Sequence, residues 1–209
     1  MALLIFWGEW YRMYIYSVYG FGKMKTESAV GITIRAISKE HKVLFAQFLK
    51  DGSSSEIQYL KDKVALLTTQ TKGIVLPQNK TANDNEAVLN MYNRICNMLS
   101  AGEYNLVILD EILVALDMEL LSITLLNRLI SICKAMDVDM YMTGRVRNKT
   151  LRQYIQEVSD CVTNAYCVKH MFDTYCSKCK RTFPYHYTYC PDCGRQLDVS
   201  RPCKEGRDY

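Results

Sequence analysis

The sequence predicts an α/β fold, in which a parallel sheet is flanked by helices and followed by a small cysteine-containing appendage. Short apolar runs rich in β-branched and aromatic residues alternate with stretches of helical periodicity over residues 13–173. Two of these runs are almost continuously apolar, which is typical of strands buried on both faces of a sheet. Two closely spaced cysteine pairs fall in residues 174–209. We therefore divide the chain into an uninformative segment over 1–12, a main domain over 13–173 and the appendage.

The first half of the main domain begins with a predicted strand over residues 13–19, where aromatic and β-branched side chains predominate. A helix is expected over 25–40, because its apolar residues recur at helical spacing. Residues 43–49 are nearly all apolar and predict a second, buried strand. A looser stretch is expected after this strand, with polar and turn-forming residues at 51–55 and later at 77–85.

The second half continues the alternation of strand and helix. Its expected elements are a helix that starts near residue 83 or 84, a strand over 106–112, a helix over 118–136, a strand over 138–142, a polar helix over 148–158 and a strand-like segment over 161–168. Repeated strand–helix units predict a parallel sheet, because parallel neighbours need long crossover connections.

Composition limits the class of protein. The chain has 209 residues, of which 49% are hydrophobic and 23% charged, and this suits one main domain with an appendage. Four prolines and ten glycines argue against a disordered or fibrous protein. The formal net charge is +4, and residues 174–209 carry +3 of it, from seven Lys/Arg against four Asp/Glu. The main domain is therefore nearly neutral.

The sequence favours a cytoplasmic protein with no membrane segment. The apolar start at residues 1–7 lacks a basic leader and is cut short by Glu9, so we do not interpret it as a signal peptide. No apolar run approaches the roughly 20 residues that span a bilayer. Five of the nine cysteines lie outside the paired motifs, and such an odd, scattered set favours a reducing compartment.

The turn after the first predicted strand has the composition of a phosphate-binding loop. It reads Gly20-Phe21-Gly22-Lys23-Met24-Lys25-Thr26. Glycines would let backbone N–H groups face an anion, Lys25 would neutralise phosphate charge, and Thr26 would offer a hydroxyl to Mg²⁺. The usual pattern has Gly where Met24 stands, and Met at a positive φ would cost about 1 kcal/mol or more. A Gly-containing turn with surface lysines is the alternative.

A second feature points to the same edge of the sheet. Four apolar residues over 106–109 are followed by Asp110 and Glu111, which places two carboxylates at a strand end. Such acids can hold Mg²⁺ through water or orient a reacting group. A solvated acidic strand end is the alternative. The loop and the acid pair, occurring in this order on one sheet, favour a site for a Mg²⁺-bound nucleotide.

With these motifs in place, the chain resembles the P-loop ATP:corrinoid adenosyltransferases, a family with a P-loop NTPase-like fold that adenosylates cob(I)alamin and related corrinoids. The likeness runs from about residue 14 to residue 172 and rests on the order and spacing of several motifs. These are the loop at 20–26, Arg35-Ala36, Gln47-Phe48-Leu49-Lys50, the segment from Tyr104 to Glu111, Thr143-Gly144-Arg145, and Lys169-His170 with Phe172.

The resemblance implies a transferase that uses ATP, Mg²⁺ and a corrinoid acceptor, with Co(I) attacking the 5′ carbon of ATP and triphosphate leaving. Lys25, Thr26 and Glu111 would then serve catalysis, and Thr26, Asp110 and Glu111 would hold Mg²⁺. The implied nucleotide-binding residues are Gly20, Phe21, Gly22, Lys23, Met24, Lys25, Thr26, Glu27, Arg35 and Arg145. Family members often pair as dimers, so a homodimer is one possible assembly.

Four departures from the family pattern support an alternative. Met24 stands where the family has Gly, and the acid Glu27 stands where it has Thr or Ser. Residues 72–77 contain no aromatic, although the family carries aromatics there, and 169–172 read Lys-His-Met-Phe in place of Lys-His-Pro-Phe. The alternative is a catalytically altered module on the same fold that binds a nucleotide, a nucleic acid or a protein. ATP hydrolysis that drives a conformational change lacks an identifiable water-positioning residue.

The appendage carries the strongest local motif of the sequence. Cys176, Cys179, Cys190 and Cys193 form a C-x₂-C-x₁₀-C-x₂-C pattern. Two such pairs supply the four thiolates of a closed, structural Zn²⁺ site, which would fold a segment too short to build its own core. Neighbouring basic and aromatic residues could bind nucleic acid through phosphates and stacked bases. We expect docking on the main domain or on a protein partner instead, and the family resemblance does not cover this zinc ribbon.

Overall fold

The computed structural model describes residues 13–20, 24–69, 80–166, 174–183, 189–190 and 192–197. The chain divides into two compact units, Met1–Ala165 and Tyr166–Tyr209, and each is described by itself. The predicted segment 1–12 and the predicted boundary at residue 173 lie outside the described residues, so both stay predictions.

The first unit is built on a six-stranded sheet with the order β3-β2-β4-β5-β1-β6. Its strands are β1 (Ile15–Tyr19), β2 (Val43–Gln47), β3 (Ala65–Thr68), β4 (Leu106–Asp110), β5 (Asp139–Gly144) and β6 (Cys161–Asn164). Every neighbouring pair is parallel. The predicted α/β fold with a parallel sheet is therefore confirmed.

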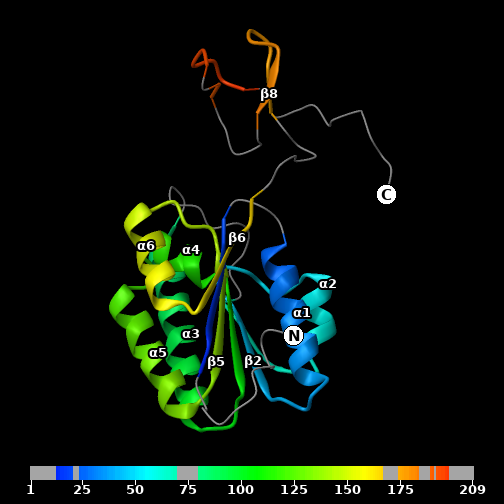
Figure 1. The fold of residues 1–209 in the computed structure, drawn as a ribbon, viewed down its shortest axis with the longest axis vertical. Coiled ribbons are helices and arrows are strands. Elements are labelled where there is room, and N and C mark those ends of the chain that lie inside the picture. The colour runs from blue at the N-terminus through cyan, green and yellow to red at the C-terminus, as the bar shows by residue number, and fades with distance from the viewer. Residues whose placement is uncertain are drawn as a thin grey trace. The chain divides into compact units, whose positions relative to one another are not determined.

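Helices cover both faces of this sheet (Figure 1). They are α1 (Lys25–Ile37), α2 (Ser55–Leu60), α3 (Ala82–Ser100), α4 (Ile112–Asp117), α5 (Ile123–Met136) and α6 (Lys149–Val158). Successive strand residues point to opposite faces, so β4 buries Leu106 and Ile108 against α1 and α2, and Val107 and Leu109 on the other side. Each face thus has its own apolar layer, and this is why the strands read as continuous apolar runs.

The structure corrects the expected elements in one region of the first half. The stretch between Asp51 and residue 85 was expected to be loose, but it contains α2 and β3. The next helix starts earlier than predicted, because Thr81 and Asp84 form a reciprocal capping box ahead of α3.

The helix predicted over 118–136 is confirmed only from residue 123, as α5, and the strand predicted over 106–112 ends at Asp110, ahead of the unpredicted helix α4. Glu111 has a left-handed backbone (φ 63°) that ends β4 and starts α4, and Ser122 caps α5 with its side chain. The strand predicted over 161–168 ends at Asn164. Among the described residues, no helix combines the length and the apolar character needed to cross a membrane.

The second unit contains a two-stranded antiparallel hairpin of β7 (Thr174–Cys176) and β8 (Arg181–Phe183). An isolated bridge joins Tyr189 to Gln196. Its small buried cluster consists of Cys176, Phe183, Cys190 and Leu197. A core of this size supplies little apolar burial, so the cysteines themselves form much of the interior.

Candidate nucleotide site and candidate metal centre

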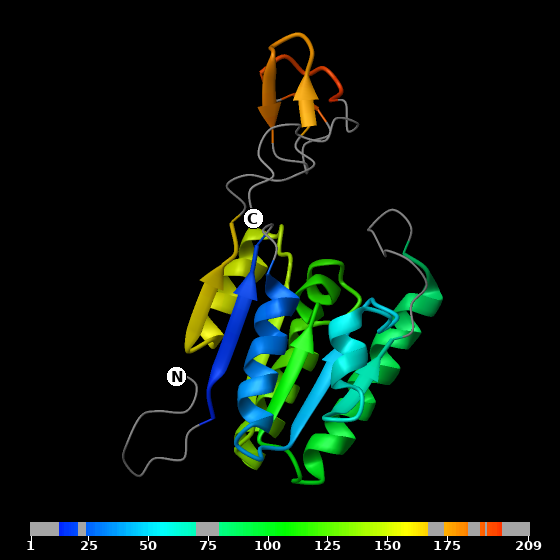
Figure 2. The same ribbon diagram turned by 90° about the vertical axis from the view of Figure 1, so that its right-hand side faces the viewer.

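The carboxyl ends of the parallel strands meet at one edge of the sheet, as the strand arrows in Figure 2 show. Gln47 is the last residue of β2, and the strand register places it directly beside Asp110, the last residue of β4. Thr143 lies near the end of β5, and Thr26 is in the first turn of α1, just after β1. Polar side chains from distant parts of the sequence therefore converge at this edge, where α/β folds bind ligands.

Asp110 is the centre of this cluster. Its side chain is fully buried, with 0% exposure, and both carboxylate oxygens accept hydrogen bonds. Four side chains donate to it, namely Thr143 Oγ1 at 2.6 Å, Gln47 Nε2 at 2.9 Å, Lys50 Nζ at 3.0 Å, and Thr26 Oγ1 at 3.1 and 3.2 Å. A carboxylate bound on both oxygens is held in one orientation, which is what a preorganised metal or phosphate site needs.

Lys50 places its ammonium among the same groups. Its Nζ lies 3.0 Å from Thr26 Oγ1, 3.0 Å from Asp110 Oδ2 and 3.6 Å from Glu111 Oε1. Burial by itself would lower the pKa of Lys50, but attraction to the two carboxylates and hydrogen bonds to them raise it overall. Lys50 therefore stays charged and acts as the counter-ion of Asp110.

Glu111 is turned back toward the cluster by its left-handed backbone. Its N–H donates to Thr143 Oγ1 at 3.0 Å. Burial and the charge of Asp110 raise the pKa of Glu111, while Lys50, Lys25 and Arg145 act in the opposite direction. Two acids and three basic groups thus influence one another at this edge of the sheet.

Lys25 and Arg145 reach this cluster electrostatically. Burial lowers the pKa of Lys25, and the positive charge of Arg145 lowers it further, whereas Glu111 and Asp110 oppose both effects. Arg145 follows β5 and is half-buried. The structure therefore brings together five of the predicted residues: Lys25, Thr26, Asp110, Glu111 and Arg145.

Other predicted residues lie elsewhere. Arg35 is exposed in the last turn of α1, ten residues beyond Lys25, or roughly 15 Å at about 1.5 Å per residue. Glu27 is exposed in the first turn of α1, where an acid suits the helix dipole. Phe21, Gly22 and Lys23 lie outside the described residues, as do the stretches 72–77 and 169–172.

Three of the seven described non-glycine residues with a positive φ follow strands that end at this edge. Met24, Leu49 and Glu111 have φ values of 74°, 56° and 63°, in the left-handed region that L-residues avoid. Met24 is also the N-cap of α1, yet it makes no side-chain capping hydrogen bond and its side chain is 66% exposed. The predicted strain at Met24 is therefore present, and clusters of such strain are typical of functional sites.

A close approach of two strands explains the glycine at position 20. Its φ is 120°, and a Cβ at this position would collide with the carbonyl oxygen of Ala165 and the side chain of Asn164. The glycine therefore allows the end of β1 to pass close to the end of β6.

Gln47 and Lys50 were not predicted as site residues, and Thr143 was expected only to line the same crevice together with Gly144 and Arg145, although all three lie in motifs that carry the family resemblance. The available signal was a polar residue at the carboxyl end of an otherwise apolar strand. Gln47 follows Val-Leu-Phe-Ala in β2, and Thr143 follows Met-Tyr-Met in β5. Lys50 carried no such signal, because a lysine after a strand is usually solvated.

The donor set of this site fits Mg²⁺. Gln47 is 1% exposed and donates from Nε2 to Asp110, which leaves its Oε1 without a hydrogen-bond partner among the residues that the structure describes. An unsatisfied buried acceptor of this kind costs about 1–3 kcal/mol. With the oxygens of Thr26, Asp110 and Glu111, it forms a set of hard oxygen donors, the ligands that Mg²⁺ prefers.

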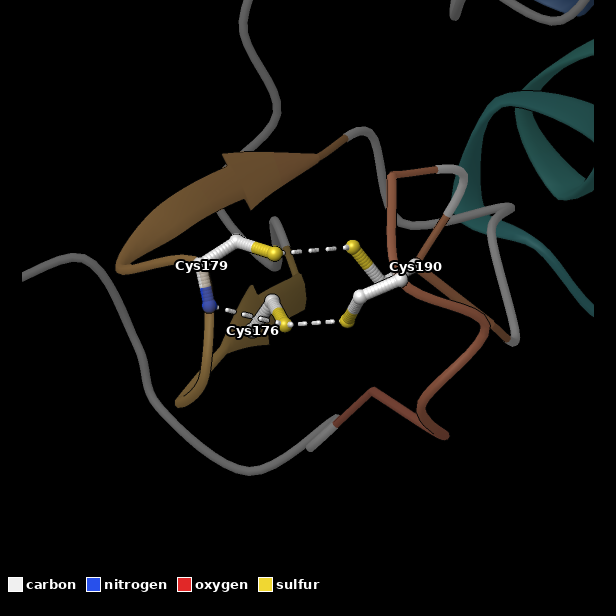
Figure 3. Close-up of side chains that lie close together, drawn as sticks. Cys176, Cys179 and Cys190 are labelled. Atoms are coloured by element: carbon white, nitrogen blue, oxygen red, sulfur yellow. Dashed lines mark hydrogen bonds between the residues drawn. The ribbon is translucent and has the colours of Figure 1, made fainter.

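The second unit holds a cluster of four cysteines. The sulfur atoms of Cys176, Cys179, Cys190 and Cys193 all lie within 4.8 Å of one another. Figure 3 shows the three labelled cysteines pointing toward one another, with Cys176 and Cys179 in the hairpin and Cys190 outside it. The sulfur–sulfur distances are 3.6 Å for Cys176–Cys193 and 3.8 Å for Cys179–Cys190. A tetrahedral Zn²⁺ with Zn–S bonds of about 2.3 Å would separate its sulfurs by about 3.8 Å.

The four thiols differ in their surroundings. A side-chain hydrogen bond with Cys193 raises the pKa of Cys179 to about 12, and burial raises the pKa of Cys190, whereas the backbone favours the thiolate of Cys176. The N–H of Cys179 donates to Cys176 Sγ at 3.4 Å. This backbone hydrogen bond is the main cause that lowers the pKa of Cys176 to about 7, against the opposing effect of burial. Since Zn²⁺ binds the thiolate form, the arrangement is compatible with the predicted zinc site.

The fold and the cluster around Asp110 define a class of protein, the α/β proteins in which a parallel sheet carries a polar site at the carboxyl ends of its strands. Comparison with known families narrows this further. A family model for ATP:corrinoid adenosyltransferase BtuR/CobO/CobP matches residues 12–181. The chain belongs to this family.

The match has a defined extent along the chain. It covers the first unit from residue 12 onward and extends into the second, where it includes Cys176 and Cys179 but ends before Cys190 and Cys193. The expectation that the resemblance leaves the ribbon uncovered therefore holds only for the second cysteine pair. A comparison with curated proteins finds none that matches the chain.

Proposed function

We propose that the first unit binds ATP with Mg²⁺ at the edge of the sheet around Asp110 and transfers the adenosyl group to a reduced corrinoid. In this reaction the bond between the 5′ carbon and the triphosphate oxygen breaks, and a bond from cobalt to that carbon forms. The electron pair comes from Co(I), so no side-chain nucleophile is needed. The observation that supports the proposal best is the buried Asp110 carboxylate, fixed by Thr26, Gln47, Lys50 and Thr143.

Each nearby side chain has a task in this proposal. Thr26, Asp110 and Glu111 would hold Mg²⁺ through their oxygens, and the bound ion would offset charge on the leaving triphosphate. Lys25, at the start of α1, and Arg145, after β5, would bind the triphosphate oxygens and stabilise the charge that develops there. In support, the charges of Lys25 and Arg145 both lower the pKa of Glu111.

One observation favours a second candidate, in which the chain binds a ligand without transfer. Met24 keeps a positive φ at the start of α1, where a glycine would turn freely, and it projects an exposed side chain beside the loop. A loop held in this way would have less freedom to wrap its backbone amides around a triphosphate. A nucleotide-, nucleic-acid- or protein-binding module is the alternative on this fold.

Titration calorimetry of the zinc-loaded full chain with ATP and Mg²⁺ tests the nucleotide step. We expect saturable binding that Lys25→Ala abolishes and that Lys42→Ala leaves unchanged, since Lys42 is an exposed lysine that pairs only weakly with Glu103 at 3.9 Å. Absence of ATP binding, or equal binding by Lys25→Ala, would overturn the proposal.

Reaction with cob(I)alamin under anaerobic conditions tests the transfer step. We expect the absorbance of Co(I) to decay with formation of adenosylcorrinoid and free triphosphate in equal amounts. ATP binding without this product would favour the binding module.

For the second unit we propose a structural Zn²⁺ site formed by Cys176, Cys179, Cys190 and Cys193, the four residues whose sulfurs converge. With four protein ligands the site is closed, so it would serve folding and not catalysis. Metal analysis of protein purified without chelator should give one zinc per chain. A chain that contains no zinc and keeps its ribbon hairpin would contradict this proposal.

A further inference from the structure

The ammonium group of Lys50 lies where a metal ion bound by the candidate ligands would lie. Its Nζ donates to Thr26 Oγ1 and to Asp110 Oδ2, both at 3.0 Å, and lies 3.6 Å from Glu111 Oε1. These are the three side chains that the proposed function assigns to Mg²⁺. An ammonium and a divalent cation cannot share the same oxygens at close range, because their charges repel each other.

The backbone at Lys50 is anchored while its side chain has a route outward. The N–H of Phe48 donates to the carbonyl of Asp110 at 2.9 Å, and the carbonyl of Lys50 accepts from Thr69 Oγ1 at 3.3 Å. The Lys50 side chain is 34% exposed, so its end lies near the surface of the site. The ammonium can therefore leave the carboxylates by side-chain rotation alone, without moving β2 or its neighbours.

The hydrogen bonds at Thr26 are arranged for such an exchange. Its hydroxyl donates its proton to Asp110, and its oxygen accepts from Lys50. A metal would take the lone pair that Lys50 now uses and would leave the bond to Asp110 intact. Only the Lys50 interactions have to change.

We propose that Lys50 is the resident cation of this site, that it holds Thr26, Asp110 and Glu111 together while no metal is bound, and that it is exchanged for the divalent cation when ATP arrives. The released ammonium then binds the polyphosphate that comes with the metal. This inference rests on the proposed function, because it uses the same three ligands. It adds that metal and nucleotide each raise the affinity of the chain for the other, and that Lys50 causes this coupling.

Binding of Mn²⁺, followed by the paramagnetic resonance signal of the free ion, tests this directly without measuring activity. The variants are Lys50→Met, which removes the charge but keeps an unbranched side chain, and Lys50→Arg, which keeps the charge. Lys42→Met is the matched control for loss of an exposed lysine.

We expect Lys50→Met to bind Mn²⁺ alone at least about tenfold more tightly than the unmodified chain, because a competing cation is gone. ATP should strengthen Mn²⁺ binding to the unmodified chain but much less to Lys50→Met. Lys50→Arg and Lys42→Met should both stay close to the unmodified chain. Equal or weaker Mn²⁺ binding by a folded Lys50→Met protein would overturn the inference.

Two further arms keep the outcome interpretable. Adding Asp110→Asn to Lys50→Met should remove the gain, since the Mn²⁺ ligand is then lost. Lys50→Gln repeats the test if Lys50→Met does not fold by circular dichroism, and the same gain is expected. If Mn²⁺ with ATP fails to bind the unmodified chain, the proposed function fails; if it binds and neither neutral variant gains affinity for Mn²⁺, only the role of Lys50 fails.

Discussion

The two candidate metal sites of this chain are built in opposite ways. The site around Asp110 draws its side chains from β2, β4, β5 and α1, and each is held by a large apolar core. The cysteine site draws all four ligands from residues 176–193, and its unit has a buried cluster that includes two of those cysteines. The fold of the first unit forms its site, whereas the second unit has too small a core to fold without a metal bound at its site.

This difference has a thermodynamic consequence. A preformed site changes little when its ligand is removed, because strands and helices already fix the side chains. A short segment whose interior is made of ligands gains its folding free energy from the metal. We therefore expect metal removal to unfold the second unit and to leave the first intact.

The largest effect should follow from Cys190→Ser, because it removes a buried ligand of the cysteine site. Structural zinc contributes roughly 10–16 kcal/mol of apparent binding free energy in small domains. We expect loss of the stoichiometric zinc and rapid proteolysis within the second unit, measured by metal analysis and limited proteolysis. Thermal unfolding of the first unit should not change.

Cys161→Ser is the matched control, because Cys161 is an exposed thiol in β6, far from the cluster in sequence. This variant should keep its zinc and its resistance to protease. Stoichiometric zinc in the Cys190→Ser protein would show that the two units do not differ in the way proposed.

The next effect in size should follow from Asp110→Ala, which leaves the charge of Lys50 and three further donors without their acceptor. Breaking a buried ion pair from one side typically costs about 3–5 kcal/mol. We expect that loss in the free energy of unfolding by urea, together with loss of Mg²⁺-dependent ATP binding. Glu103→Ala, at an exposed surface pair, should change the free energy of unfolding by less than about 1 kcal/mol.

The same contrast explains what the sequence could predict. The cysteine motif is local, so spacing alone identified all four ligands. The apolar runs predicted β1, β2, β4 and β5, because burial on both faces leaves an apolar signal. The edge strand β6 was also predicted, although most of its residues are exposed. β3 was missed because it is only four residues long and follows closely after the short helix α2, so neither element shows a long periodic pattern.

The oxygen site was only partly predictable for a physical reason. Lys25, Thr26, Asp110 and Glu111 lie in recognisable motifs, but Gln47, Lys50 and Thr143 join them through strand order and register. Sequence order does not reveal that β2 and β5 both flank β4. The left-handed conformation of Leu49, just ahead of Lys50, is likewise invisible in a run of apolar residues.

A smaller effect is expected at the loop, where Met24→Gly removes the Cβ from a left-handed residue. Relief of that strain is worth about 1 kcal/mol, which corresponds to a severalfold change in an equilibrium constant. If the strain limits the loop, ATP should bind about three- to tenfold more tightly in calorimetry. Met24→Ala keeps the Cβ and should bind ATP as the unmodified chain does.

A gain in affinity shared by Met24→Gly and Met24→Ala would assign the effect to the exposed methionine side chain and not to the backbone. Unchanged affinity in both would mean that the loop is not limited by strain at this residue.

The smallest effect concerns the opposite edge of the sheet, where Asp139 begins β5. Among the residues that the structure describes, Asp139 accepts only the N–H of Tyr14, at 2.8 Å, and no lysine or arginine of these residues is among the groups that shift its pKa. Burial, with the charges of Asp137 and Asp160, raises the pKa of Asp139 from 3.8 to about 6 in spite of that hydrogen bond. It is therefore the counterpart of Asp110 without a counter-ion.

Because the folded-state pKa of Asp139 lies above the unfolded value, the folded chain retains this proton to higher pH. The stability that it contributes is present below about pH 3.8 and is lost as the pH rises through about 6. Asp139→Asn keeps an acceptor for Tyr14 and removes the titration, so its stability relative to the unmodified chain should rise between pH 4 and pH 7. Urea unfolding of both proteins at pH 4 and pH 7 measures this difference in stability. A difference that does not change with pH would mean that Asp139 is solvated well enough to ionise normally. The contrast with Asp110, to which Lys50 provides a counter-ion, would then be weaker.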